Sequence, residues 1–156
     1  MTQIEIEARL ATKEDLPSIM EIENLCFKAP WKEEDILHEI YENEFASVWV
    51  VELFDPNTKQ KVVAGYSDYW RTFDSASIVQ IAIHPSLQGR QLGSFLMDEI
   101  YNDCYAKKVR TITLEVRKSN QKAINFYKKH GFVQLLTKPN YYSNGEDALY
   151  MSLEVK

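Results

Sequence analysis

The apolar run over residues 77–83 stops at a proline, crosses a short loop rich in Gln, Gly and Arg, and enters an amphipathic segment over about 91–107. The run is apolar enough to be buried on both faces, which is typical of a central strand. A buried strand that leads through a tight loop into a helix must pack that helix on its own sheet. This unit therefore predicts an α/β arrangement.

The rest of the chain also contains both strand and helix patterns. Residues 4–10 alternate and predict a half-buried strand with Ile4, Ile6, Ala8 and Leu10 on one face. Further strands are expected at about 46–54, 61–72 and 111–116 and twice after Gly131; further helices are expected between Thr12 and Pro30, at about 32–43, and in SNQKAINFYKKHG. The 156 residues fit one α/β (α+β) domain over 1–156 with a mixed sheet.

Composition excludes several function classes. The chain has no run of about 18 apolar residues, which argues against a membrane span, and its net charge of −5 argues against general nucleic-acid binding. Cys26 and Cys104 are far apart and lack metal-ligand spacing. Few cysteines and an N-terminus unlike a secretory signal favour the reducing cytoplasm.

Charge is unevenly distributed along the chain. Residues 14–44 hold ten acids against two lysines, whereas residues 107–138 hold nine bases against Glu115 alone. Two interpretations stay open. The segments form two solvated faces, or they steer a cationic substrate to one side and an anionic one to the other.

The loop between the strand expected over 77–83 and the helix expected over about 91–107 is a candidate anion site. A helix N-terminus offers unpaired N–H groups and a partial positive charge, and the glycines at 89 and 93 allow a ligand to approach the backbone closely. Arg90 can add a charged fork. The loop lacks both the Walker A ending and the three-glycine dinucleotide pattern. An ordinary tight connection is the alternative.

Four blocks together resemble one enzyme family. IAIHPSLQGRQLGSFLM resembles motif A of the Gcn5-related N-acetyltransferases (GNAT), and LEVRKSNQKAINFYKKHGF resembles their second conserved block. CFKAPW and NYYSNGEDALYM narrow the resemblance to the RimI type, which acetylates the N-terminal alanine of a small-subunit ribosomal protein. Gln91 stands where the motif has a glycine, and we expect it in ordinary helical geometry because a positive φ would be costly there.

The resemblance implies a fold and a co-substrate. The fold would be a mixed, mostly antiparallel seven-stranded sheet with about four helices on its faces and a splayed central cleft. The co-substrate would be acetyl-CoA, without a metal. The strand end would bind the pantetheine arm through its main chain and supply an oxyanion donor, and the loop would bind the diphosphate. The implied cofactor-binding residues are Ile81, Ala82, Ile83, Gln88, Gly89, Arg90, Gln91, Leu92, Gly93, Ser94 and Asn120.

Two residues are candidates for acid–base catalysis. In TITLEV, Glu115 lies on the face opposite Ile112, Leu114 and Val116, so it is either an outward-facing glutamate or a base. Tyr127 is either a core aromatic or an acid, since a phenol with a pKa near 10 is protonated at neutral pH. The resemblance implies the catalytic role for both: Glu115 accepts the amine proton and Tyr127 protonates the departing thiolate.

Three aromatic residues are candidates for substrate binding. Trp31 either packs between the first two helices or lines a peptide groove. Tyr141 and Tyr142 could be surface turn residues, whereas the resemblance implies a lid over the first residues of the substrate. The resemblance as a whole implies an N-terminal protein acetyltransferase. An acetyltransferase for a small amine and a non-catalytic acyl-CoA sensor are the alternatives.

Overall fold

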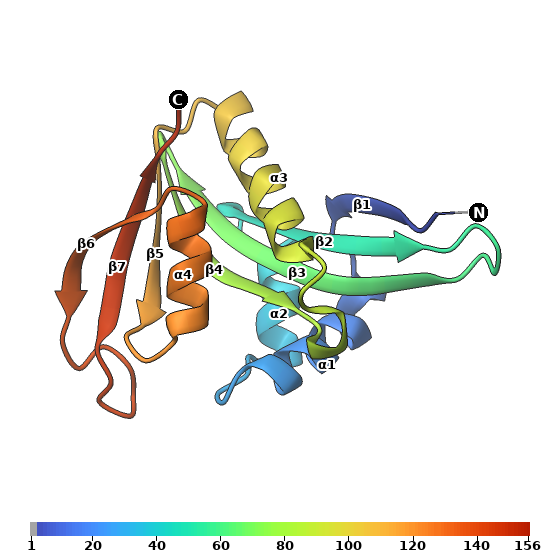
Figure 1. The fold of residues 1–156 in the computed structure, drawn as a ribbon, viewed down its shortest axis with the longest axis horizontal. Helices are drawn as coiled ribbons and strands as arrows, with labels where there is room; N and C mark the ends of the chain where they lie inside the picture. Colours follow the sequence, from blue (N-terminus) through green and yellow to red (C-terminus); the bar gives the residue numbers. More distant parts are fainter. Residues whose placement is uncertain (1–2) are drawn as a thin grey trace.

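The computed structural model describes residues 3–156, which form a seven-stranded sheet with helices on both faces (Figure 1). The strand order is β1-β2-β3-β4-β5-β7-β6, and every neighbouring pair is antiparallel except β4 and β5. The strands are β1 (Glu5–Leu10), β2 (Ala46–Phe54), β3 (Lys61–Thr72), β4 (Ser75–Ile83), β5 (Thr111–Arg117), β6 (Val133–Lys138) and β7 (Ala148–Glu154). The helices are α1 (Leu16–Cys26), α2 (Glu33–Tyr41), α3 (Leu92–Ala106) and α4 (Gln121–Lys129).

The four helices divide between the two faces of the sheet. Ile19 and Ile22 of α1 and Ile36 of α2 pack against β2 and β3 on one face. On the other face, α3 and α4 pack over β5, where Ile112, Leu114 and Val116 form the buried row that the alternation predicts. Cys104 lies in this second core and is fully buried. The predicted mixed, mostly antiparallel sheet with about four helices is therefore confirmed.

The centre of the sheet is split. β4 and β5 pair only from Ser75 to Ser77 against Thr111 to Thr113, and they diverge beyond that point. The half of β4 that leads to Ile83 pairs with β3 alone, so its other edge offers main-chain donors and acceptors without a partner strand. The predicted splayed cleft is therefore present.

Two expectations about strand burial are wrong. Ile6 and Leu10 of β1 are 46% and 57% exposed, because β1 is an edge strand, and Ile6 lines an open hollow beside α3. Residues 77–83 were expected to be buried on both faces, yet Ile81 and Ile83 are only half-buried. Both of these side chains line a cavity beside the split in the sheet.

The ends of α4 follow the local sequence signals. The Asn120 side chain accepts a hydrogen bond from the Ala123 N–H at 3.2 Å, which makes it the N-cap. Gly131 follows the helix with φ 95°, in the left-handed region that favours glycine at this position. None of the helices within residues 3–156 has the length and apolarity needed to cross a bilayer.

Candidate active site

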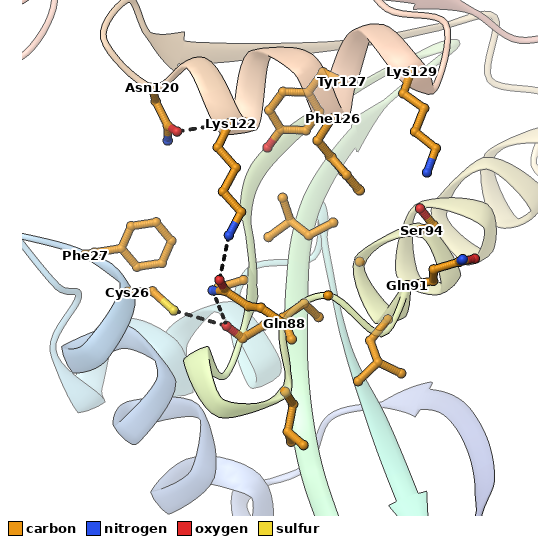
Figure 2. A pocket seen from close by; sticks show the side chains of 18 residues that line it. Cys26, Phe27, Gln88, Gln91, Ser94, Asn120, Lys122, Phe126, Tyr127 and Lys129 are labelled. Carbon is orange, nitrogen blue, oxygen red and sulfur yellow. Dashed lines mark hydrogen bonds between the residues drawn. The ribbon is translucent and has the colours of Figure 1, made fainter.

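A cavity of about 560 Å³ opens beside the diverging end of β4 (Figure 2). The end of α1 and the Pro85–Leu87 turn form one side of it, and α4 forms the other. Its lining residues are Cys26, Phe27, Ile81, Ala82, Ile83, Leu87, Gln88, Gly89, Gln91, Leu92, Gly93, Ser94, Asn120, Lys122, Ala123, Phe126, Tyr127 and Lys129.

The loop into α3 presents a row of unpaired backbone donors. Within residues 3–156, the N–H groups of residues 88–94 find no main-chain acceptor, and the first helical bond runs from the Phe95 N–H to the Gln91 carbonyl at 3.1 Å. No acidic residue lies in the first turn of α3. Unpaired N–H groups and the positive end of the helix dipole form a site for an anion such as a phosphate group.

The expected helical geometry of Gln91 is wrong. Gln91 has φ 63° and ψ 19°, in the left-handed region, and it immediately precedes the first residue of α3. Gly89 also has a positive φ, 81°. A left-handed conformation costs a residue with a side chain roughly 1–2 kcal/mol. The backbone at Gln91 therefore has the conformation that a glycine would adopt there, and this conformation is strained for a residue with a side chain.

Gly93 fixes the approach of α4 to this loop. A Cβ added at Gly93 would lie 3.3 Å from the Phe126 ring, which is closer than side chains normally pack. The absence of a side chain lets Phe126 of α4 cover the first turn of α3. Gly93 thereby lets α4 pack closely on the start of α3, where both helices border the cavity.

Side chains from three elements meet at the end of β4. The Ile83 carbonyl accepts hydrogen bonds from the Cys26 thiol at 3.3 Å and from the Gln88 amide at 3.1 Å. Lys122 of α4 donates to the Gln88 side-chain oxygen at 2.8 Å, as Figure 2 shows. These bonds connect α1, the loop and α4 across the cavity mouth.

Tyr127 combines burial with access to the cavity. The residue is 8% exposed and packs in the core under α4, yet its ring borders the cavity and its hydroxyl points inward (Figure 2). No hydrogen bond to this hydroxyl occurs within residues 3–156. Burial raises the pKa of Tyr127, and the Tyr142 phenol nearby adds to the rise. The phenol is thus protonated and free to donate.

Glu115 lies on the other face of the split sheet. Its neighbours Leu114 and Val116 point toward α3 and α4, so the Glu115 side chain points away from them. The carboxylate accepts a hydrogen bond from Lys138 Nζ at 2.8 Å. It also lies near Tyr142, whose pKa is raised by burial and, in smaller part, by the charge of Glu115. Tyr142 therefore lies near both Glu115 and Tyr127.

This arrangement agrees with a comparison with known families. The model of the Acetyltransferase (GNAT) family matches residues 16–132. The chain belongs to this family.

Two members of the GNAT family are similar to this chain over most of its length. The [ribosomal protein bS18]-alanine N-acetyltransferase of Salmonella typhimurium (strain LT2) is 30% identical over 144 residues, covering 90% of this chain and 92% of that protein. A Bacillus subtilis (strain 168) protein, whose name assigns it the same activity provisionally, is 40% identical over 139 residues and 88% of each chain.

Solved GNAT structures agree with the fold. The ribosomal-protein-S18-alanine N-acetyltransferase of Escherichia coli superimposes with a TM-score of 0.83 at 28% identity, covering 97% of this chain and 95% of that chain. Ard1 of Thermoplasma volcanium gives a TM-score of 0.82 at 26% identity, over 97% and 98% of the two chains.

The predicted GNAT site residues fall into two groups. Every predicted cofactor-binding residue except Arg90 lines the cavity, together with Tyr127. Arg90 is exposed and lines a neighbouring hollow with Ile6 and Asp98. Glu115, Trp31, Tyr141 and Tyr142 lie outside the cavity lining. Within residues 3–156, His, Cys, Asp and Glu side chains form no group of three that could hold a metal ion.

The loop between β6 and β7 carries the two predicted substrate tyrosines of the GNAT domain. The rings of Tyr141 and Tyr142 meet edge to face at 5.0 Å. The guanidinium of Arg117 lies 4.0 Å from the centre of the Tyr142 ring and donates a hydrogen bond to Glu146 at 3.1 Å. Tyr141 is 49% exposed. Tyr142 is therefore held by Arg117, whereas Tyr141 is open to solvent.

The structural role of Glu23 was not predicted from the sequence, where Glu23 is one of the ten acids of residues 14–44. Glu23 is fully buried, and its carboxylate accepts hydrogen bonds from the Trp31 N–H at 2.8 Å, the Tyr66 hydroxyl and the Gln80 amide. Trp31 itself packs against the core that α1 and α2 share. Glu23 thereby fixes the α1–α2 loop to β3 and β4. A glutamate among apolar helix positions was the only available signal.

Two more acidic residues of the segment 14–44 are also buried in this GNAT domain. Asp15 accepts a hydrogen bond from Arg9 at 2.8 Å, and Glu39 accepts one from Asn43 at 2.8 Å. The acidic segment is thus only partly a solvated face, because these carboxylates fix the interior. In the basic segment, Lys122 and Lys129 line the cavity.

Proposed function

We propose that this chain is an N-terminal protein acetyltransferase, with residues 1–156 as one catalytic domain acting in the cytoplasm. It would transfer acetyl from acetyl-CoA directly to the N-terminal alanine of ribosomal protein bS18. The observation that carries the proposal is the split between β4 and β5, with unpaired loop donors and Tyr127 on one side and Glu115 on the other. The names of the relatives supply the substrate.

The cavity residues fit acetyl-CoA as a substrate. The N–H groups of residues 88–94 would bind the diphosphate, with Arg90, Lys122 and Lys129 adding positive charge around it. The pantetheine arm would extend along the edge of β4 at residues 81–83 that has no partner strand, as an extra strand does. The thioester would then lie in the split, within reach of both faces of the sheet.

The acceptor peptide would approach from the side of α1, α2 and the β6–β7 loop. Trp31, Tyr141 and Tyr142 would line its path. An α-amino group has a pKa near 8, so much of it arrives as an ammonium ion. The Glu115 carboxylate would hold this ammonium and take one proton from it.

The transfer itself needs no covalent intermediate on the protein. The neutral amine would attack the thioester carbonyl carbon, and a main-chain N–H of residues 81–83 would donate to the oxyanion. The carbon–sulfur bond would then break as Tyr127 donates its proton to the leaving thiolate. The second amine proton would pass to solvent, Glu115 would release the proton it took to solvent, and Tyr127 would take one proton back from solvent, so that one proton is released per turnover. The products would be the acetylated peptide and CoA.

The test is an acetylation assay with mass-spectrometric detection. A peptide with the N-terminal sequence of bS18 is compared with matched peptides altered at the first residue and with spermidine. The proposal expects acetylation of the α-amino group and a preference for alanine. Preferential acetylation of spermidine would identify a small-amine enzyme instead. Calorimetric binding of acetyl-CoA with no acetylated product would identify a sensor.

A further inference from the structure

His130 contacts the first turn of α3 without a role in the chemistry above. It caps the C-terminal end of α4, and its Nε2 shares a hydrogen bond of 2.9 Å with the Ser94 hydroxyl. The ring also lies against Phe126, with ring centres 4.7 Å apart. Phe126 in turn covers Gly93. The imidazole is therefore held in place by its hydrogen bond to Ser94 and by its contact with the Phe126 ring.

Ser94 lies where a bound phosphate would meet α3. It is in the first helical turn, its N–H has no partner within residues 3–156, and its side chain borders the cavity near Lys129 (Figure 2). A serine hydroxyl has one hydrogen to donate and two lone pairs that accept. The direction of its hydrogen decides whether it attracts or repels an anion.

We propose that His130 is a positioning residue that turns the Ser94 hydroxyl toward the diphosphate of bound acetyl-CoA. This inference rests on the proposed function, because it takes acetyl-CoA as the ligand. When Nε2 carries a proton, His130 donates to Ser94 Oγ, and Ser94 donates its own hydrogen to the phosphate oxygen. When Nε2 lacks a proton, Ser94 donates to His130 and presents only lone pairs to the anion.

The charges around His130 link this bond to protonation. Burial and Lys129 lower the pKa of His130, whereas Asp98 of α3 raises it. His130 is therefore mainly neutral at neutral pH in the free protein. A bound diphosphate beyond Ser94 favours both the Nε2–H form and the imidazolium, and the carbonyl end of α4 also favours a cation there. Binding of acetyl-CoA should then be accompanied by uptake of protons.

The first experiment is isothermal titration calorimetry of CoA on the full chain. His130→Ala should weaken binding about tenfold, as expected for the loss of a hydrogen bond to a charged ligand. His130→Gln should bind nearly as the parent does, because its amide can donate from a position close to that of Nε2. In a Ser94→Ala background, His130→Ala should have no further effect.

A second readout separates positioning from structural support. Binding enthalpies are measured near neutral pH in buffers of different ionisation enthalpy, which gives the number of protons taken up. The 3′-phosphate of CoA also titrates at about pH 6 and contributes equally to both proteins, so the parent should take up a larger fraction of a proton than His130→Gln. A merely structural role would leave this number unchanged.

Three results would overturn the inference. They are unchanged binding in His130→Ala, equal weakening in the parent and Ser94→Ala backgrounds, and proton uptake in His130→Gln equal to that of the parent. A parent protein that fails to bind CoA would refute the proposed function itself. Unfolding curves confirm that each variant is folded, and the His130→Gln variant tests the inference if His130→Ala does not fold.

Discussion

Lys138 on β6 reaches across β7 to Glu115 on β5, and its Nζ lies 2.8 Å from the Glu115 carboxylate. On the way it passes over the Tyr150 ring, 4.7 Å from the ring centre. The hydrogen bond to Glu115 raises the pKa of Lys138. The proposed base is therefore already paired with an ammonium group in the free protein. A substrate ammonium must displace Lys138 to reach it.

Replacement of Glu115 by Gln removes the proposed base while keeping the side-chain shape. We expect turnover with an alanine-starting peptide to fall about 10²–10⁴-fold, the usual size of general acid–base catalysis. The Kd for acetyl-CoA should be retained, since Glu115 lies outside the cavity lining. Steady-state kinetics and calorimetry measure the two effects. Parental turnover in this variant would exclude Glu115 as the base.

Replacement of Lys138 by Met removes the competitor for Glu115. We expect the KM for the peptide to fall about two- to five-fold, which corresponds to the measured strength of partly exposed ion pairs. The KM for acetyl-CoA should not change. The unfolding free energy should fall by at most about 1 kcal/mol, because both partners are partly exposed. A higher peptide KM would mean that Lys138 binds substrate instead of competing with it.

Replacement of Tyr127 by Phe tests the proposed acid. The ring would keep its packing, but no hydroxyl would remain to protonate the thiolate. We expect a kcat loss of about 10²–10⁴-fold with a nearly unchanged Kd for acetyl-CoA. An acetyl donor with a more acidic thiol leaving group should recover part of the loss. Equal losses with both donors would mean that the hydroxyl is not the acid for the thiolate, and parental turnover would assign Tyr127 to packing alone.

Replacement of Gln91 by Gly tests the strain before α3. Glycine adopts φ 63° without the steric cost that Gln91 bears, so we expect the unfolding free energy to rise by about 1 kcal/mol in urea titrations. Gln91→Ala is the matched control, because it loses the same side chain but keeps a Cβ. Stabilisation of both variants alike would trace the effect to the side chain and not to the backbone.

Asp68 makes stability depend on pH. It is buried against Glu39, which together with burial raises the pKa of Asp68 to about 9. The folded chain thus keeps a proton on Asp68 that the unfolded chain releases above about pH 4. Because the folded state binds more protons between these values, this contribution to stability falls as the pH rises toward 9, by at most about 1.4 kcal/mol per pH unit.

Asp68→Asn should remove this slope, since an amide of nearly the same shape does not titrate. Urea unfolding at about pH 5.5 and about pH 8.5 measures the difference. Asp74→Asn on the exposed β3–β4 turn is the control, and it should follow the parent. A parental slope in Asp68→Asn would mean that other groups cause the pH dependence.

Much of the fold was accessible from local patterns. The bounds expected for β2 and β3 match those observed, and the cap at Asn120 and the stop at Gly131 are where the sequence places them. These features depend on residues a few positions apart, whose propensities and hydrogen bonds act within one turn or strand. The exposure of Ile6 was not accessible, because alternation shows which side chains share a face but not whether a helix covers it.

The same division holds for the site. The sequence by itself determined the order of the elements, the bare start of α3, and the face of β5 that carries Glu115. Only the tertiary structure decided that Gln91 adopts a left-handed conformation and that Lys138 is paired with Glu115. It also decided that the buried Glu23 accepts a hydrogen bond from the Trp31 N–H and that His130 is hydrogen-bonded to Ser94. The contacts of Lys138 with Glu115 and of His130 with Ser94 join elements distant in the chain, and such contacts exist only once the sheet and its helices have packed together.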